Sequence, residues 1–108
     1  MAYDAYILDD DGNPVLESDP IKWADWMKTA DRKIAREQIG EFTYVSTVFL
    51  GIDHGLDSEG RPLLYETMIF GRPDDEEYCE RYATKEEALR GHRRGIAEAD
   101  KEMLADRD

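Results

Sequence analysis

The segment that most constrains the fold is the run at positions 42–52, Phe-Thr-Tyr-Val-Ser-Thr-Val-Phe-Leu-Gly-Ile. Nearly every residue in it is β-branched or aromatic, which favours an extended strand over a helix. Apolar side chains fall at both odd and even positions, so both faces of the strand carry them. A strand of this kind belongs in the interior of a sheet, and we predict that the domain is built around it.

The flanking segments supply partners for this central strand. Turn residues at 57–60 separate it from a second long apolar segment, 63–70, and the two predict a long antiparallel hairpin. Residues 3–17 predict a shorter hairpin, because an Asp-Gly-Asn-Pro turn interrupts them. Residues 78–82 predict a short edge strand.

A first helix is predicted to begin at Pro20, where the preceding Ser-Asp pair can cap it. Its apolar residues recur at spacings of four, three and four. The helix could run to Gly40, or it could end near Ala30 and leave 33–39 as a strand. We favour the strand, because the Gly-Glu pair at 40–41 can make a two-residue hairpin turn.

A second helix is predicted after Thr84, because Thr-Lys-Glu-Glu fits a capping box in which Glu87 reaches back to the cap. It runs to about Leu104, and Gly91 and Gly95 would let it approach a sheet or another helix closely. Both tryptophans fall on the first helix and are expected to anchor it. Together the elements predict a single α+β domain over residues 1–108, a twisted antiparallel sheet of four to six strands with two helices packed on one face.

Charge narrows the class of partner. The chain has 108 residues, with 14 Lys and Arg against 26 Asp and Glu, and a net charge of −12. A protein that neutralises phosphates needs a cationic surface, so direct binding to nucleic acid or anionic lipid is disfavoured. The acidic excess either keeps a small protein in solution or complements a basic surface on another protein.

The densest acidic run has two interpretations. It could be a solvated sheet edge on which charge prevents other strands from pairing. It could also be the contact surface for a basic partner, with the acidic loops at 9–11 and 57–59 as outlying contacts. The residues predicted to bind the partner are Asp74, Asp75, Glu76, Glu77 and Glu80.

The cellular location is inferred from the absence of a recognisable targeting or membrane-spanning segment. The first residues lack the basic segment and apolar run of a secretory signal, and no apolar run approaches the length of a membrane span. We therefore expect no membrane contact and a cytoplasmic location, in the host cell if the protein is viral. The single cysteine, Cys79, cannot form an internal disulfide.

The candidate metal-binding or catalytic residues are Asp53, His54 and Glu66. They could form a metal site or a general base, which would make the chain a metal-binding protein or a hydrolase. The favoured interpretation is structural, because a metal site needs three converging ligands and neither a cysteine nor a His-x-x-x-His pair joins these three. The chain also lacks a phosphate-binding glycine loop. We predict no catalytic residue, no cofactor and no enzyme activity.

Three stretches resemble a family of small, uncharacterised phage and prophage proteins. The stretches are VSTVFLGIDH at 45–54, LLYETMIFG at 63–71 and RYATKEEALRGH at 81–92. The family pattern is close to VSTVFLGLDH, PLLFETMVFGG and RYST-EEA-GH, and the similarity covers roughly residues 36–92. It departs at Ala83, where serine is common, and at the single Gly71.

The resemblance implies a viral origin but assigns no role to His54, Glu66 or His92. Small acidic phage proteins often bind and block a host protein, including bacterial defence complexes. By that analogy we expect an inhibitor that binds a basic host surface, such as a nucleic-acid-binding one, as an anti-CRISPR or other anti-defence protein. A minor virion assembly protein is the alternative, and the sequence does not set the oligomeric state.

Overall fold

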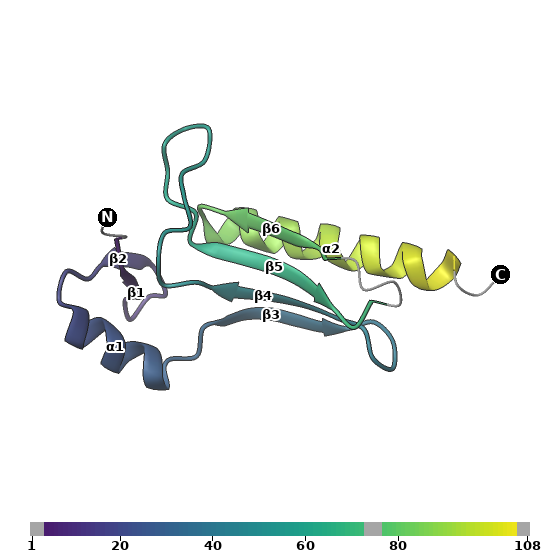
Figure 1. Ribbon diagram of the computed structural model, residues 1–108, viewed down its shortest axis with the longest axis horizontal. Helices are drawn as coiled ribbons and strands as arrows, with labels where there is room; N and C mark the ends of the chain where they lie inside the picture. The colour runs from purple at the N-terminus through teal and green to yellow at the C-terminus, as the bar shows by residue number, and fades with distance from the viewer. Residues whose placement is uncertain (1–3, 73–76, 106–108) are drawn as a thin grey trace.

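The computed structural model describes residues 4–72 and 77–105 (Figure 1). These residues form two antiparallel sheets and two helices, so the predicted α+β class is confirmed. The elements, in chain order, are β1 (Tyr6–Leu8), β2 (Pro14–Leu16), α1 (Pro20–Thr29), β3 (Lys33–Gln38), β4 (Tyr44–Phe49), β5 (Tyr65–Phe70), β6 (Cys79–Tyr82) and α2 (Lys85–Ala105).

The main sheet is an antiparallel meander in the order β3-β4-β5-β6. The two strands with the strongest β-forming residues, β4 and β5, occupy its centre, as the sequence predicts. β1 and β2 pair with each other in a separate two-stranded sheet. The predicted range of four to six strands is therefore met by a sheet of four and a hairpin of two.

The strand register gives the main sheet two unlike faces. Residues paired across antiparallel strands point to the same side, and successive residues alternate between sides. One side is buried beneath α2, and we call it the covered face. The six central residues of that face are at most 5% exposed: Val45, Thr47, Phe49, Tyr65, Thr67 and Ile69.

Two glycines of α2 bring it onto the covered face. A Cβ atom at Gly91 would overlap the ring and hydroxyl of Tyr82, and one at Gly95 would lie 3.0 Å from Val45 Cγ1. The helix backbone therefore lies directly against the sheet, and the glycine spacing serves contact with the sheet rather than with another helix. Figure 1 shows α2 running along the length of the strands.

The first helix is short and is attached at one end of the sheet. It ends at Thr29, and Lys33–Gln38 is a strand, so the favoured alternative is confirmed. Trp26 meets Phe49 of the covered face edge-on at 5.9 Å, and the Trp23 indole N–H donates to the Gly51 carbonyl at 3.0 Å. Both tryptophans thus anchor α1, as predicted.

The connection between β3 and β4 is longer than predicted. The ladder ends at the pair Gln38 and Tyr44, so residues 39–43 form the connection in place of a two-residue turn at 40–41. The Gly40 N–H donates to the Thr43 carbonyl, and the Thr43 hydroxyl donates to Gly71 O at 2.8 Å. This second bond ties the connection to the chain leaving β5, a contact that local turn propensity cannot predict.

Candidate binding surfaces

The structure divides the predicted acidic run. Asp74, Asp75 and Glu76 lie outside the described residues, and their contact with a partner stays a prediction. Glu77 is exposed. Glu80 lies on β6 opposite Thr67, which assigns its side chain to the covered face.

Glu80 is held by three donors. Arg94 donates to it at 3.0 Å, and the hydroxyls of Tyr78 and Tyr82 donate at 3.0 and 2.9 Å. Burial by itself would raise the pKa of Glu80, but the bonds from Arg94, Tyr82 and Tyr78 outweigh it and lower the pKa. Its charge is offset inside the molecule, so Glu80 ties α2 to β6.

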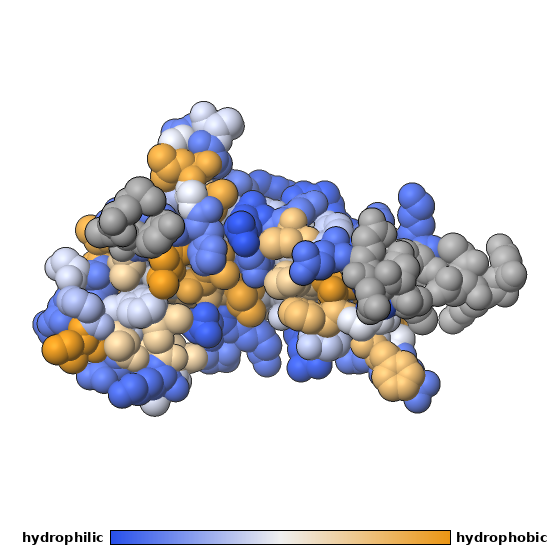
Figure 2. Space-filling model, in the orientation of Figure 1, coloured by the Kyte–Doolittle hydropathy of each residue, from blue (hydrophilic) through white to orange (hydrophobic). Residues whose placement is uncertain are grey.

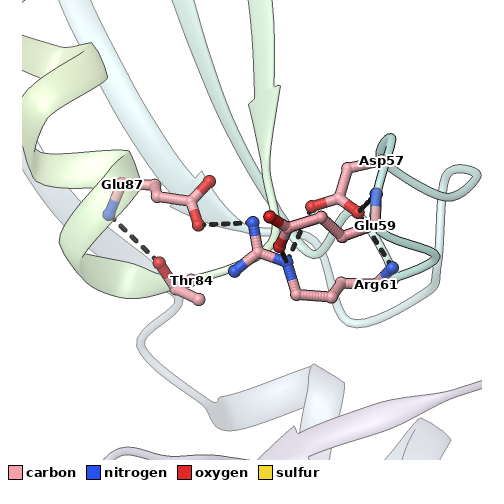
Figure 3. Close-up of polar contacts among 5 residues, drawn as sticks. All are labelled: Asp57, Glu59, Arg61, Thr84 and Glu87. Carbon is pink, nitrogen blue, oxygen red and sulfur yellow. Dashed lines mark hydrogen bonds and ion pairs between the residues drawn. The ribbon is translucent and has the colours of Figure 1, made fainter.

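A second group of carboxylates surrounds Arg61 (Figure 3). The Arg61 guanidinium lies 2.8 Å from Asp57, 3.3 Å from Glu59 and 2.8 Å from Glu87. Backbone N–H bonds, the Arg61 N–H first among them, together with the guanidinium, lower the pKa of Asp57. Arg61 therefore offsets one of the three negative charges that surround it.

The Arg61 cluster also modifies the predicted helix cap. The Glu87 N–H donates to Thr84 Oγ1 at 3.2 Å, as in a capping box. The Glu87 side chain pairs with Arg61 instead of reaching back to the cap. The four-residue spacing of Asp57 and Arg61 could have indicated the loop pair from the sequence, whereas the contact with Glu87 depends on tertiary structure.

A buried polar chain links α2 to the centre of the sheet. Thr47 Oγ1 lies 2.7 Å from His92 Nδ1 and is also hydrogen-bonded to the Thr67 hydroxyl. Both threonines are 0% exposed and His92 is 7% exposed. Burial lowers the pKa of His92 more than nearby Glu37 raises it, so the imidazole favours its neutral form. These groups satisfy one another within the core, and His92 has a structural role there.

The structure does not bring Asp53, His54 and Glu66 together as the alternative metal site requires. No group of three His, Cys, Asp or Glu side chains within residues 4–72 and 77–105 is arranged to hold a metal ion. Glu66 points to the other side of the sheet from α2, where it accepts hydrogen bonds from Arg81 at 2.9 Å and from the Cys79 thiol at 3.3 Å. Asp53 and His54 lie beyond the end of β4, and their backbones bond to Asp4 and Leu63.

The side of the sheet that α2 does not cover carries aromatic residues at one end. The Tyr44 and Phe70 rings stack with centroids 5.0 Å apart, and the Arg36 guanidinium lies 4.1 Å from the centre of the Tyr44 ring. Phe70 is 38% exposed, and Phe42 in the neighbouring connection is 75% exposed. Figure 2 shows apolar side chains at the surface over the strands, among hydrophilic ones.

Two exposed carboxylates border these rings. Glu41 precedes Phe42, and Glu77 lies at the same end of the β5–β6 pair as Phe70, since Cys79 pairs with Met68. Neither carboxylate forms an ion pair with another residue in the described part of the chain. We call this surface the sheet end, and it consists of Glu41, Phe42, Tyr44, Phe70 and Glu77.

Comparisons of the chain with protein-family models, curated proteins and solved structures found no match. In the part of the chain that the structure describes, no helix is long and apolar enough to span a membrane.

Proposed function

We propose that the protein is a binding protein without catalytic activity, and that its sheet end contacts a basic surface on another protein. The observation that carries this proposal is the exposure of Phe42 and of Phe70, which stacks on the half-buried Tyr44, together with the exposed carboxylates of Glu41 and Glu77. Exposed aromatic side chains of this kind are the residues that dominate binding energy at protein interfaces.

The chemistry of the sheet end favours a cationic partner. The face of an aromatic ring attracts an ammonium or guanidinium group, and Arg36 already makes this contact on Tyr44. Phe42 is available for the same kind of contact, with Glu41 beside it. A lysine or arginine of a partner could therefore lie over a ring and meet a carboxylate at its edge.

Long-range charge supports the same choice of partner. The net charge of −12 attracts basic proteins and speeds their association, and salt weakens that attraction. At the opposite end of the sheet, Asp57, Glu59 and Glu87 all lie within 3.3 Å of the Arg61 guanidinium, so part of their charge is offset and their oxygens are engaged. The uncompensated acids at the sheet end are the better candidates for direct contact.

The resemblance to phage proteins extends the proposal from the contact surface to the identity of the partner. We propose that the partner is a bacterial host protein with a basic surface, such as one that binds nucleic acid, and that binding inhibits it. An anti-CRISPR or other anti-defence inhibitor would act in this way in the host cytoplasm. Virion assembly is the competing function, and it predicts that the protein is present in purified particles.

The test is affinity capture from lysates of candidate bacterial hosts at low and high salt, with proteins identified by mass spectrometry. The wild type is compared with a sheet-end variant carrying Glu41→Gln, Phe42→Ser and Glu77→Gln. A matched control carries Asp4→Asn and Asp100→Asn, two exposed acids elsewhere. We expect one basic protein to be retained by the wild type and the control at low salt, and lost by the sheet-end variant.

Two outcomes would contradict the proposal. In the first, no protein is retained at low salt by the wild type. In the second, the sheet-end variant and the control retain the same protein equally well, which would remove the sheet end from the contact.

A further inference from the structure

A pocket lies at the end of the main sheet opposite the one that carries Phe42 and Phe70. It has a volume of about 400 Å³ and is bounded by the β1–β2 turn, the first residue of β5 and the first turn of α2. The residues that matter for its chemistry are Asp11, Asn13, Tyr65, Lys85 and Glu86.

The Tyr65 hydroxyl is the feature that points to a ligand. Its side chain is 0% exposed, and the hydroxyl has no hydrogen-bond partner. Buried polar groups are nearly always hydrogen-bonded, because an unpaired one keeps its full cost of desolvation. Burial, and then the charge of Glu86, raises the pKa of Tyr65 to about 12, so the hydroxyl stays neutral and can donate or accept.

The charges around the pocket select the sign of the ligand. Two acidic residues, Asp11 and Glu86, and one basic residue, Lys85, line the pocket, and the whole chain carries a net charge of −12. The first turn of α2 would attract an anion, but Glu86 and Glu87 in that turn oppose it. A cation therefore gains more here than an anion does.

We propose that this pocket binds a guanidinium group. A guanidinium is planar and carries five N–H donors, so it can bond to both carboxylates and donate to the Tyr65 hydroxyl at the same time. An ammonium offers a more compact set of donors and would bind less well. The guanidinium could belong to an arginine side chain of a protein partner or to free arginine or a related small molecule. The inference does not depend on the sheet end.

The test is a titration of ¹⁵N-labelled full-length protein followed by NMR. The probes are L-arginine, agmatine and Nα-acetyl-arginine methylamide, with Nα-acetyl-lysine methylamide and inorganic phosphate as comparisons. We expect the guanidinium compounds to shift the amide signals of Asp11, Gly12, Lys85 and Glu86, and to bind more tightly than the lysine compound. Tighter binding of the capped arginine than of L-arginine would identify a protein side chain as the source, and the reverse a small molecule.

Two variants test the assigned contacts. Tyr65→Phe keeps the ring and removes the hydroxyl, and Glu86→Gln removes one charge, and each should weaken guanidinium binding about tenfold. Glu98→Gln, on the same helix but away from the pocket, should leave it unchanged. The proposal is overturned if phosphate binds in place of the guanidinium compounds, if none of the probes shifts these signals, or if Tyr65→Phe binds with undiminished affinity.

Discussion

The two faces of the main sheet are built from the same strands, yet they differ in almost every physical respect. On the covered face, Thr47 and Phe49 are fully buried against α2 and the core. On the open face, the alternate positions Tyr44 and Ser46 are half-buried, and Phe70 is exposed. Strand alternation thus separates two tasks. One face supplies most of the buried core, and the other leaves aromatic groups at the surface.

The largest expected effect is on the covered face, at the contact between helix and sheet. Gly91→Ala would place a methyl group into Tyr82, which is 5% exposed and has little room to move. Overpacking of this kind costs about 3 kcal/mol, and the better helix propensity of alanine returns about 1 kcal/mol.

Urea unfolding should therefore show a net loss of about 2 kcal/mol for Gly91→Ala. Gly95→Ala should lose less, because its Cβ would lie 3.0 Å from Val45 Cγ1, where a small shift relieves the contact. Equal stability of Gly91→Ala and the wild type would contradict the close helix packing.

A neighbouring pair of hydroxyl residues compares the two faces directly. Thr47→Val on the covered face removes the partner of His92 and of Thr67, and should lower the free energy of unfolding by about 1–2 kcal/mol. Ser46→Ala on the open face should change it by less than about 0.5 kcal/mol. Similar losses in the two variants, measured by urea unfolding, would show that the faces are not energetically distinct.

Acidification should destabilise the folded protein through His92, which is buried against the covered face. Because burial lowers the pKa of His92, the folded state binds a proton less tightly than the unfolded state does. The free energy of unfolding should therefore fall as the pH drops below about 6.5, and this contribution should level off below the folded pKa.

His92→Gln should reduce the slope between pH 7 and pH 5, while Ser46→Ala, which removes no titratable group, should not. A stability that rises on acidification through this range would contradict the assignment.

The smallest stability effects are expected at the candidate binding groups. Tyr65→Phe removes a buried hydroxyl that has no partner, so unfolding of the free protein should be unchanged or up to about 1 kcal/mol less favourable. Phe42→Ser alters a side chain that is 75% exposed and should change stability by less than about 0.5 kcal/mol. Thermal and urea unfolding measure both, and a loss above 2 kcal/mol in either would show a structural role instead.

The sequence predicts the fold better than it predicts the sites. Residues 42–52 and 63–70 identify the central hairpin because β-branched and aromatic residues dominate both, and Thr84 marks the start of α2 because capping is local. The prediction of a two-residue turn at 40–41 was wrong, because the connection is shaped by a hydrogen bond from Thr43 to Gly71, which is distant in the sequence.

Charge density in the sequence was a weaker guide to function. Glu80 belongs to the densest acidic run, yet Arg94 of α2 offsets its charge, and Arg61 offsets part of the charge of Asp57 and Glu59. The sequence cannot show the pair of Glu80 and Arg94, because helix and sheet must first be packed together, whereas the pair of Asp57 and Arg61 is local. The sheet end was missed because Tyr44 and Phe70 become neighbours through strand register.

Amide hydrogen exchange of the chain alone and with the captured host protein tests the division of the two faces most directly. The account predicts that exchange slows at residues 40–46 and 68–72 in the complex, and that residues 93–101 on α2 are unaffected. Protection along 93–101 with no change at 40–46 and 68–72 would contradict it, because the contact would then lie on the helix.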